Sequence, residues 1–481
     1  MNNNPSIKIN AILNTIRQLC SVLFPLITVP YITRVLGADY YGRVNWVYSI
    51  VSYFVLLAGF GISTYAVREG ARIREDANKI STFSNEVFSI NVLSSLFSCL
   101  LLLTLTLFWH KLHDNIYLVL IQSLVIFFTT IGADWINQIY EDYKYLTIRY
   151  IVMQIMSVVL MFVFVKDSKD YLVYAFITIL ASAGGNLLNI VYIRRYIHLR
   201  IVLYSDLKKH LKPMLVLFAN SVAIITYLNT DITLLGIFKT NEDVGIYSVA
   251  SKIYIIVKQL INALIVVSLP RLSQLIGNND DSHYHELLNK IINSVLLVLI
   301  PTITGLFALS ENIIYIIAGS NYVSGTLSLR ILSFSLFFAV FACFFQNCIM
   351  LPQNLEKQFF VATIASCLLN FGLNLVIIPI FSFNGAAITT LASELLVCVI
   401  CYLYSKSNIN ISVDFNSIFS VIVGSALVYF ECFFISHYFN NQLMIIIISI
   451  FLGIALYLFV LKLFSNTYLN SLFSFFKRVK E

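Results

Sequence analysis

Long apolar stretches follow one another along the whole chain and are separated by short polar connections. At 1.5 Å per residue, a helix of about 20 residues crosses a hydrocarbon layer of roughly 30 Å. Lipid offers no partners for backbone hydrogen bonds, and barrel strands need only about ten residues, so these stretches must be helices. The pattern predicts an all-α polytopic membrane protein of about fourteen transmembrane helices, at 11–36, 43–66, 83–109, 116–137, 147–165, 171–193, 213–238, 244–269, 289–316, 326–350, 359–381, 385–404, 415–438 and 442–464.

Composition supports this class, because 59% of the 481 residues are hydrophobic and only 11% are charged. An average soluble domain is nearer one quarter charged. The N-terminus passes into an apolar stretch without a small-residue cleavage site, so we expect no removable signal peptide. All eight cysteines lie in apolar stretches, where a thiol behaves as a small hydrophobe, and we expect no disulfide. The pair Cys398 and Cys401 has no second pair or histidine nearby, so we expect no metal site there.

The distribution of lysine and arginine predicts the orientation, because these residues accumulate in cytoplasmic loops. With the N-terminus inside, 21 of them fall on cytoplasmic segments, 6 on external segments and 4 within helices. Both termini are therefore expected in the cytoplasm. The basic clusters at 68–79, 194–212 and 477–480 are interpreted as topology determinants beside an anionic leaflet, with no role for nucleic acid.

Weak internal repeats suggest two similar halves. The segment ITILAS at 177–182 recurs as ITTLAS at 388–393, and Asn137 and Ile139 match Asn347 and Ile349 at nearly the same offset. An even number of spans in each half gives both halves the same orientation, as in transporters built of parallel repeats. We predict an N-terminal lobe at 1–200, a C-terminal lobe at 201–410, and two further helices with a basic cytoplasmic tail at 411–481.

The short connections exclude several classes of protein. No loop is long enough for a soluble catalytic domain, and no Gly-Lys pair is present to begin a phosphate-binding P-loop. The pair His283 and His285 is better explained as a solvated loop pair than as a metal site. We therefore predict that the chain is not an enzyme. The classes of protein that remain are a channel, a transporter and a scaffold.

Charged residues within the predicted spans are the main candidate chemistry. Insertion scales give a cost on the order of 2.5–3.5 kcal/mol for an ionised side chain at the bilayer centre. Two explanations stay open: the charges pair with one another or reach an interface, or the cations line a solvated cavity that receives an anionic headgroup. The cations are Arg17, Lys252, Lys258 and Arg330. The deep carboxylates are Asp231, Glu394 and Glu431, so the deep charges lean positive, four cations to two carboxylates, when the appended helix that carries Glu431 is set aside.

Polar residues also share single faces of three predicted helices. Residues spaced by 3, 4, 7 or 11 positions lie on one side of a helix, whereas Lys258 points roughly 120° away from Lys252. One of these two lysines is therefore open to a structural role. The predicted cavity faces are Asn10, Asn14, Arg17 and Ser21 on the first helix, Asn220, Tyr227 and Asp231 on the seventh, and Lys252 and Gln259 on the eighth.

Two segments carry a family resemblance. The run LGADYYGRVNWVYSIVSYFVLLAGFGISTYAVREGARIRED at 36–76 and the run GADWINQIYEDYKYLTIRYIVMQ at 132–154 resemble the Wzx flippases of O-antigen and related polysaccharide units. These flippases belong to the multidrug/oligosaccharidyl-lipid/polysaccharide exporter superfamily. The likeness extends over the whole chain in helix number and lobe order, and the second half is more diverged.

The resemblance implies a bacterial inner-membrane flippase. Such a protein moves undecaprenyl-diphosphate-linked oligosaccharide from the cytoplasmic to the periplasmic leaflet by alternating access through a cationic cavity between the lobes. The implied partners are this lipid, membrane lipids, and polysaccharide polymerase and chain-length proteins. No cofactor is expected; a proton or sodium gradient is the energy source to consider, with Asp231 or Glu394 as the coupling carboxylate. The alternatives are an ion-coupled multidrug antiporter of the related branch and a non-transporting scaffold for polysaccharide assembly.

Overall fold

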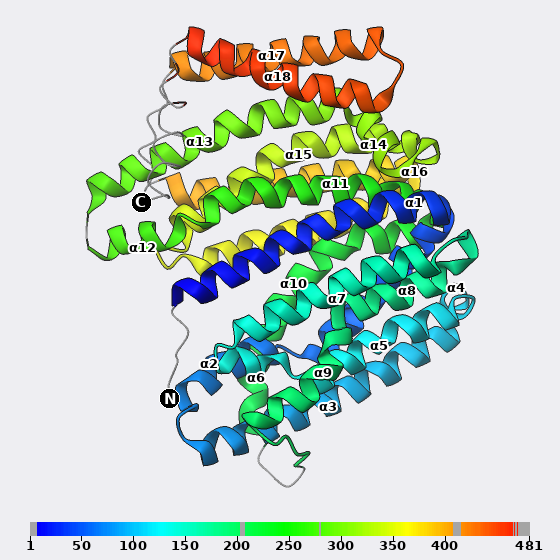
Figure 1. Cartoon of the computed structure of the whole chain (residues 1–481). Helices are drawn as coiled ribbons and strands as arrows, with labels where there is room; N and C mark the ends of the chain where they lie inside the picture. The colour runs from blue at the N-terminus through cyan, green and yellow to red at the C-terminus, as the bar shows by residue number, and fades with distance from the viewer. Residues whose placement is uncertain are drawn as a thin grey trace. The chain divides into compact units, whose positions relative to one another are not determined.

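The computed structural model describes residues 7–202, 207–278, 280–406, 415–464, 466 and 469, and in these ranges it contains helices and no strand. Within these ranges, eleven helices are long and apolar enough to cross a membrane, and Ile116–Gly132 is a shorter apolar helix. Figure 1 shows long helices connected by short turns. The predicted all-α fold of a multi-pass membrane protein is confirmed.

Two long helices each contain one break where separate helices with loops between them were predicted. α1 (Ile7–Gly59) is non-helical at Gly37, where φ is 73°, a backbone region that favours glycine. α16 (Glu356–Ser405) is non-helical at Ser382, three residues after Pro379. At Ser382 φ is 50°, a left-handed backbone region that residues with a side chain rarely adopt. Fourteen spans result if each bent helix counts as two and Ile116–Gly132 is included, and that number stays a prediction.

Contacts divide the chain into two compact units, and the first contains the described residues up to Gly236 together with Thr240–Val244. Its core is an apolar cluster built from α2, α3, α6 and α10, with Ala66, Val87 and Ile136 fully buried. Besides α1, the helices of this unit are α2 (Ile62–Ile73), α3 (Ala77–Phe108), α4 (His110–His113), α5 (Ile116–Gly132), α6 (Asp134–Ile139), α7 (Tyr143–Phe164), α8 (Tyr171–Ile179), α9 (Gly185–Tyr192) and α10 (Lys208–Phe238).

The second unit contains Ile237–Lys239 and the described residues from Gly245 onward. Within it, α17 and α18 lie side by side as an orange and red pair (Figure 1), and a buried apolar cluster joins them to α13. Besides α16, its helices are α11 (Asn241–Val266), α12 (Leu269–Gly277), α13 (Asp281–Ala308), α14 (Ser310–Ala318), α15 (Thr326–Phe344), α17 (Phe415–Tyr438) and α18 (Gln442–Leu463).

The contact division does not coincide with the predicted lobe boundary at residues 200 and 201. Residues 208–236 of α10 belong by contacts to the first unit, and α17 and α18 belong to the second. These units are clusters of contacts, whereas the predicted lobes are bodies that move. The assignment of 1–200, 201–410 and 411–481 as such bodies stays a prediction.

Several helices begin earlier than predicted, because hydropathy identifies the apolar part of a helix and not its cap. α3 begins at Ala77, and the Asp76 carboxylate accepts hydrogen bonds from the backbone amides of Asn78 and Lys79 at 3.2 and 3.1 Å. These bonds hold the pKa of Asp76 below its usual value. In the same way, Asp280 caps α13, which begins eight residues before the predicted start at 289. The predicted starts at 83 and 289 are wrong for this reason.

Candidate functional site

Arg17 lies on α1 and contacts an aromatic ring of α7. Its guanidinium carbon is 5.3 Å from the ring centroid of Tyr150, within the range of a cation–π interaction. Arg17 is half-buried, and Ser21, one turn further along the same face, is exposed. The side chains of Asn10 and Asn14 lie outside the described residues. Arg17 is thus held against an aromatic surface, and no ion pair involves it within the described part of the chain.

On α10, Tyr227 is half-buried and Asp231 is buried, with 8% of its surface exposed. The side chain of Asn220, the third member of this predicted face, is not among the described ones. Two residues after Asp231, Thr233 donates a hydrogen bond to the Ser49 hydroxyl of α1 at 2.9 Å. This part of α10 therefore packs closely on the first helix.

Lys258 on α11 forms an ion pair with Glu394 on α16. The ammonium nitrogen is 2.5 Å from the Glu394 carboxylate, and the Tyr254 hydroxyl donates to the same oxygen at 2.9 Å. Glu394 is 4% exposed, whereas the Lys258 side chain keeps 26% of its surface exposed. The ion pair brings together two predicted site residues, Lys258 and Glu394. Of the two lysines on α11, Lys258 is therefore the one with a structural contact.

Lys252 and Arg330 are placed differently from Lys258. Lys252 is half-buried on α11, and no ion pair or hydrogen bond to its ammonium group occurs among the described residues. Arg330 on α15 donates from Nε to the Ser310 hydroxyl at 3.1 Å and lies over the Phe307 ring at 5.4 Å. Gln259 is exposed. Of the four predicted cations, only Lys258 forms an ion pair within the described ranges.

A buried polar ladder joins the two halves of α16, and sequence reasoning missed it. The Thr389 hydroxyl donates to the Asn374 side-chain oxygen at 2.5 Å, and the Asn374 amide donates to the Asn370 oxygen at 3.0 Å. Nearby, the Ser366 hydroxyl donates to the Ser393 carbonyl at 2.9 Å. The signal was the spacing of Ser366, Asn370 and Asn374, which recur every four residues in an apolar helix. Such bonds hold helices together inside a membrane.

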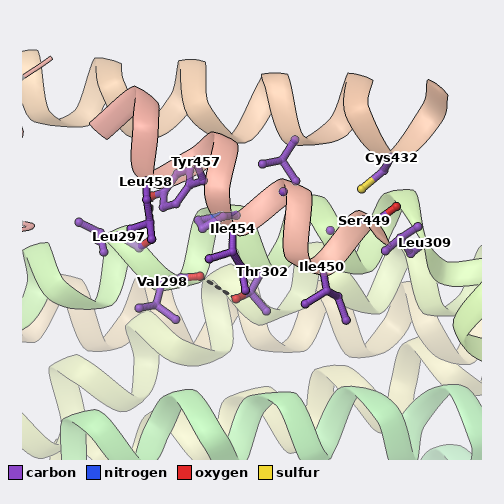
Figure 2. Close-up of a pocket in the computed structure, with 14 residues that line it drawn as sticks. Leu297, Val298, Thr302, Leu309, Cys432, Ser449, Ile450, Ile454, Tyr457 and Leu458 are labelled. Atoms are coloured by element: carbon purple, nitrogen blue, oxygen red, sulfur yellow. Dashed lines mark hydrogen bonds between the residues drawn. The ribbon is translucent and has the colours of Figure 1, made fainter. Parts of the chain in front are cut away.

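An apolar pocket lies among α13, α17 and α18 (Figure 2). Its volume is about 420 Å³, enough for part of a hydrocarbon chain, and its lining is predominantly apolar. Cys432 on the pocket wall donates a weak hydrogen bond to the Glu431 carboxylate at 3.4 Å, so an acidic group lies next to the wall. The lining residues are Leu297, Val298, Pro301, Thr302, Gly305, Leu309, Val428, Cys432, Ser449, Ile450, Gly453, Ile454, Tyr457 and Leu458.

The segment 132–154, which carries part of the family resemblance, forms a structural network in the first unit. Arg149 on α7 pairs with Asp134 on α6 at 2.6 Å, and the Asn189 amide on α9 donates to the Asn137 oxygen at 2.7 Å. Further on, the Tyr192 hydroxyl donates to Asp142 at 2.6 Å. These contacts fasten α6, α7 and α9 together, so the polar residues of this run maintain the fold of the unit.

A second network in the first unit was also missed by sequence reasoning. His210, at the start of α10, belongs to the basic cluster 194–212 that was interpreted as a topology determinant, yet it is only 4% exposed. Its Nε2 is 2.8 Å from the carboxylate of Glu86 on α3, and its Nδ1 is 2.7 Å from the hydroxyl of Tyr65 on α2. The available signal was Glu86, an acidic residue within an apolar helix that needs a partner.

Comparison with known families identifies the chain. The family model described as polysaccharide biosynthesis protein matches residues 7–276, more than half of the sequence. The chain belongs to this family. The resemblance to transporters of polysaccharide units seen in segments 36–76 and 132–154 is confirmed by that match and by a relative named as an O-antigen transporter.

Similarity to other proteins extends beyond residue 276 and covers most of this chain. A protein of Escherichia coli K12 named as an O-antigen transporter is 25% identical over 422 residues, which cover 85% of this chain and 99% of the relative. A lipid II flippase MurJ structure in an inward closed conformation has a TM-score of 0.75 at 16% identity, covering 95% of this chain and 98% of MurJ. An inward-facing multidrug transporter of the MATE family has a TM-score of 0.57 at 12% identity, covering 80% and 94%. At these identities the structures establish the shared fold.

Proposed function

We propose that this family member is a flippase that moves undecaprenyl-diphosphate-linked oligosaccharide from the cytoplasmic to the periplasmic leaflet of a bacterial inner membrane. The observation that carries the proposal is the family match over residues 7–276, joined to similarity with an O-antigen transporter along 99% of that relative. The physical task fits such a fold. A diphosphate and several sugars cannot cross hydrocarbon unaided, while a prenyl chain can stay in it.

The diphosphate is proposed to be held by Arg17, Lys252, Lys258 and Arg330. Guanidinium groups can bind phosphate through two parallel hydrogen bonds, and ammonium groups bind it as point charges. Arg17 and Arg330 lie against aromatic rings, which leaves guanidinium donors for a ligand. Lys258 would contribute only in a state in which it leaves Glu394. Sugars are proposed to contact the cavity-face side chains, which are Asn10, Asn14, Ser21, Asn220, Tyr227, Asp231 and Gln259.

The hydrocarbon tail is proposed to enter the pocket among α13, α17 and α18. The lining is apolar and belongs to three membrane-crossing helices, so a prenyl chain is the matching occupant. Gly305 on this wall has no atom within 4 Å of the position that a Cβ would take, so open space lies above it. A tail bound there would stay in hydrocarbon surroundings while the headgroup moves.

Ion coupling is proposed for Asp231 or Glu394, the two buried carboxylates of the candidate set. Association with polysaccharide polymerase and chain-length proteins remains a prediction. Two other functions are outcomes of the test. A multidrug antiporter or a non-transporting scaffold would leave polysaccharide export unrestored in a flippase-deficient strain. For a scaffold, export in its own host would also continue when the cations are removed.

The test is complementation of a bacterium that lacks its polysaccharide flippase. The expected result is restored surface polysaccharide, with loss of the lipid-linked repeat units that accumulate on the cytoplasmic face. Persistence of that accumulation, with the protein inserted in the membrane, would count against the flippase proposal. Strains with different repeat units would show which sugars are accepted.

Charge-removing variants test the diphosphate site. We expect Arg17→Ala and Lys252→Ala to insert normally and to reduce export by about tenfold or more, because a charged hydrogen bond contributes about 1.5–3 kcal/mol. Lys252→Arg should be milder, since it keeps the charge. The matched control is Lys290→Ala, whose ammonium is exposed and pairs with Glu286 within one helix. Full export by both Arg17→Ala and Lys252→Ala would remove the diphosphate-binding proposal.

A further inference from the structure

Three helices of the first unit bring Tyr65, Glu86 and His210 together in a buried chain of hydrogen bonds. Tyr65 on α2 is 6% exposed, and Glu86 on α3 and His210 on α10 are each 4% exposed. The Tyr65 hydroxyl is 2.7 Å from His210 Nδ1, and His210 Nε2 is 2.8 Å from a Glu86 oxygen. The ring of Phe83 lies edge-on to the imidazole at 5.6 Å. The imidazole is therefore shielded from bulk water on its apolar sides.

This arrangement can hold an imidazole with or without an added proton. In the neutral form, Nε2–H donates to Glu86, and Nδ1 accepts from the Tyr65 hydroxyl. In the imidazolium form, both ring nitrogens donate, Glu86 is the counter-charge, and the Tyr65 oxygen becomes an acceptor. The added proton sits on Nδ1, and no heavy atom has to move. The only requirement is that the Tyr65 hydroxyl hydrogen turns toward another acceptor.

The neighbouring charges balance the site. Lys209 is 2.8 Å from the buried Glu86 carboxylate and keeps 51% of its own side-chain surface exposed. On α2, Arg68 and Glu69 act on Tyr65 electrostatically and pair with each other at 2.9 Å. With His210 neutral, Glu86 and Lys209 cancel, and protonation adds one positive charge to the cluster.

The cluster is connected to the candidate transport residues through one helix. His210 lies in the first turn of α10, and Asp231 lies on the same helix 21 residues later, roughly 30 Å away at 1.5 Å per residue. α10 therefore carries the buried imidazole at its start and Tyr227 and Asp231 further along. Neither Glu86 nor His210 belongs to the residues proposed above for substrate or ion coupling.

We propose that Glu86 and His210 form a proton-binding site and that its occupancy changes during transport. The ligand is a single proton, taken up by His210 Nδ1 and stabilised by the Glu86 carboxylate. The binding part stands on the geometry of the first unit alone. The coupling part rests on the proposed flippase function, and the two parts have separate tests.

Binding is tested on the full-length protein in detergent by hydrogen–deuterium exchange at histidine C2, read by mass spectrometry across pH 4–9. The exchange rate reports how much of each histidine is protonated. We expect the exchange rate of His210 to depend on pH, and Glu86→Gln to shift that dependence toward lower pH by about one pH unit or more, because the counter-charge is lost. The control is the exchange rate of the exposed His198, which should be the same in both proteins at every pH.

Two further variants keep the binding test decisive. Tyr65→Phe retains the ring but removes the hydroxyl that is hydrogen-bonded to His210 Nδ1. The pH dependence of His210 exchange should therefore change while the fold is kept. If Glu86→Gln fails to fold, Lys209→Gln, at a half-exposed position, tests the same electrostatic environment. An unchanged His210 titration in every folded variant, or a histidine that stays in one state across the range, would overturn the proposal.

Coupling is tested in proteoliposomes with a pH indicator inside and undecaprenyl-diphosphate-linked repeat units extracted from the flippase-deficient strain. We expect substrate-dependent proton movement with the wild type, and its loss with His210→Gln and Glu86→Gln. Movement of lipid-linked units without proton movement would contradict coupling and leave the flippase proposal intact. Absence of lipid movement in the wild type would instead count against the flippase proposal.

Discussion

Three of the four cations predicted inside the spans are accommodated in two ways. Lys258 is paired with Glu394, which also accepts from Tyr254. Arg17 and Arg330 lie over aromatic rings, where the ring face attracts the guanidinium without consuming its hydrogen-bond donors. The first arrangement is complete in itself. The second leaves donors for a ligand, which is the physical basis for assigning these arginines to an anionic headgroup.

At the residue scale, the Lys258 and Glu394 pair predicts a non-additive effect on stability. Glu394→Gln should lower the free energy of unfolding by about 1–3 kcal/mol, because it leaves a half-buried ammonium without its counter-charge. Exposure of the Lys258 side chain places the expected loss toward the lower end. The double variant Lys258→Met with Glu394→Gln should be less destabilised than Glu394→Gln alone. Thermal unfolding in detergent measures both.

The control for this cycle is Lys252→Met, alone and with Glu394→Gln. Since Lys252 makes no ion pair with a described residue, its effect and that of Glu394→Gln should simply add. Additivity for the Lys258 pair as well would contradict the interpretation of Lys258 as a structural lysine.

At the scale of elements, close helix contacts depend on small residues. A Cβ placed on Gly236 of α10 would lie 1.9 Å from a ring carbon of Trp46, which is fully buried on α1. The carbonyl of Gly236 also accepts a hydrogen bond from the Lys111 ammonium, whose partial burial lowers its pKa. Within the first unit, the end of α10 is therefore held by packing against Trp46 and by the hydrogen bond from Lys111.

Gly236→Ala should destabilise the protein by about 1–3 kcal/mol, because a well-packed core yields poorly to an added methyl group. Gly372→Ala on α16 is the matched control, since nothing lies within 4 Å of its added Cβ. That control should be neutral or stabilising by about 0.5–1 kcal/mol, the usual gain over glycine inside a helix. Thermal unfolding of purified protein compares them, and equal effects would contradict the close α1–α10 contact.

The pocket among α13, α17 and α18 gives another prediction for elements. Gly305→Leu should fill the open space on α13 and leave insertion and thermal stability unchanged or improved, because apolar atoms gain contacts there. Export in the complemented strain should fall, since the hydrocarbon tail loses its place. Gly372→Leu, equally open but outside this pocket, should leave export unchanged. Normal export by Gly305→Leu would argue against a tail in this pocket.

At the scale of the whole molecule, orientation follows from the lysine and arginine bias and from an even number of spans. With 21 of the 31 basic residues on segments predicted to be cytoplasmic, both termini are expected inside the cell. Green fluorescent protein fused at either end should fluoresce, and alkaline phosphatase fused at the C-terminus should be inactive. Active phosphatase at the C-terminus would show an odd number of spans or the reverse orientation.

Much of this architecture was predictable from the chain, because a membrane restricts the solutions. The helix pattern of spans such as 442–464 follows directly from hydropathy, since lipid admits apolar helices of a fixed length. The break at Ser382 and the caps at Asp76 and Asp280 were not predicted, because dihedral angles and single hydrogen bonds leave no mark in average hydropathy.

The candidate site, too, was predictable from the sequence only in part. By itself the sequence determined the family, the all-α membrane fold and the presence of costly intramembrane charges, because each depends on composition and spacing along one helix. Only the tertiary structure decided that Lys258 belongs to Glu394 and that His210, in a basic segment, is buried against Glu86 and Tyr65. Those pairings join residues between 124 and 145 positions apart, and which helices become neighbours is determined by packing in three dimensions.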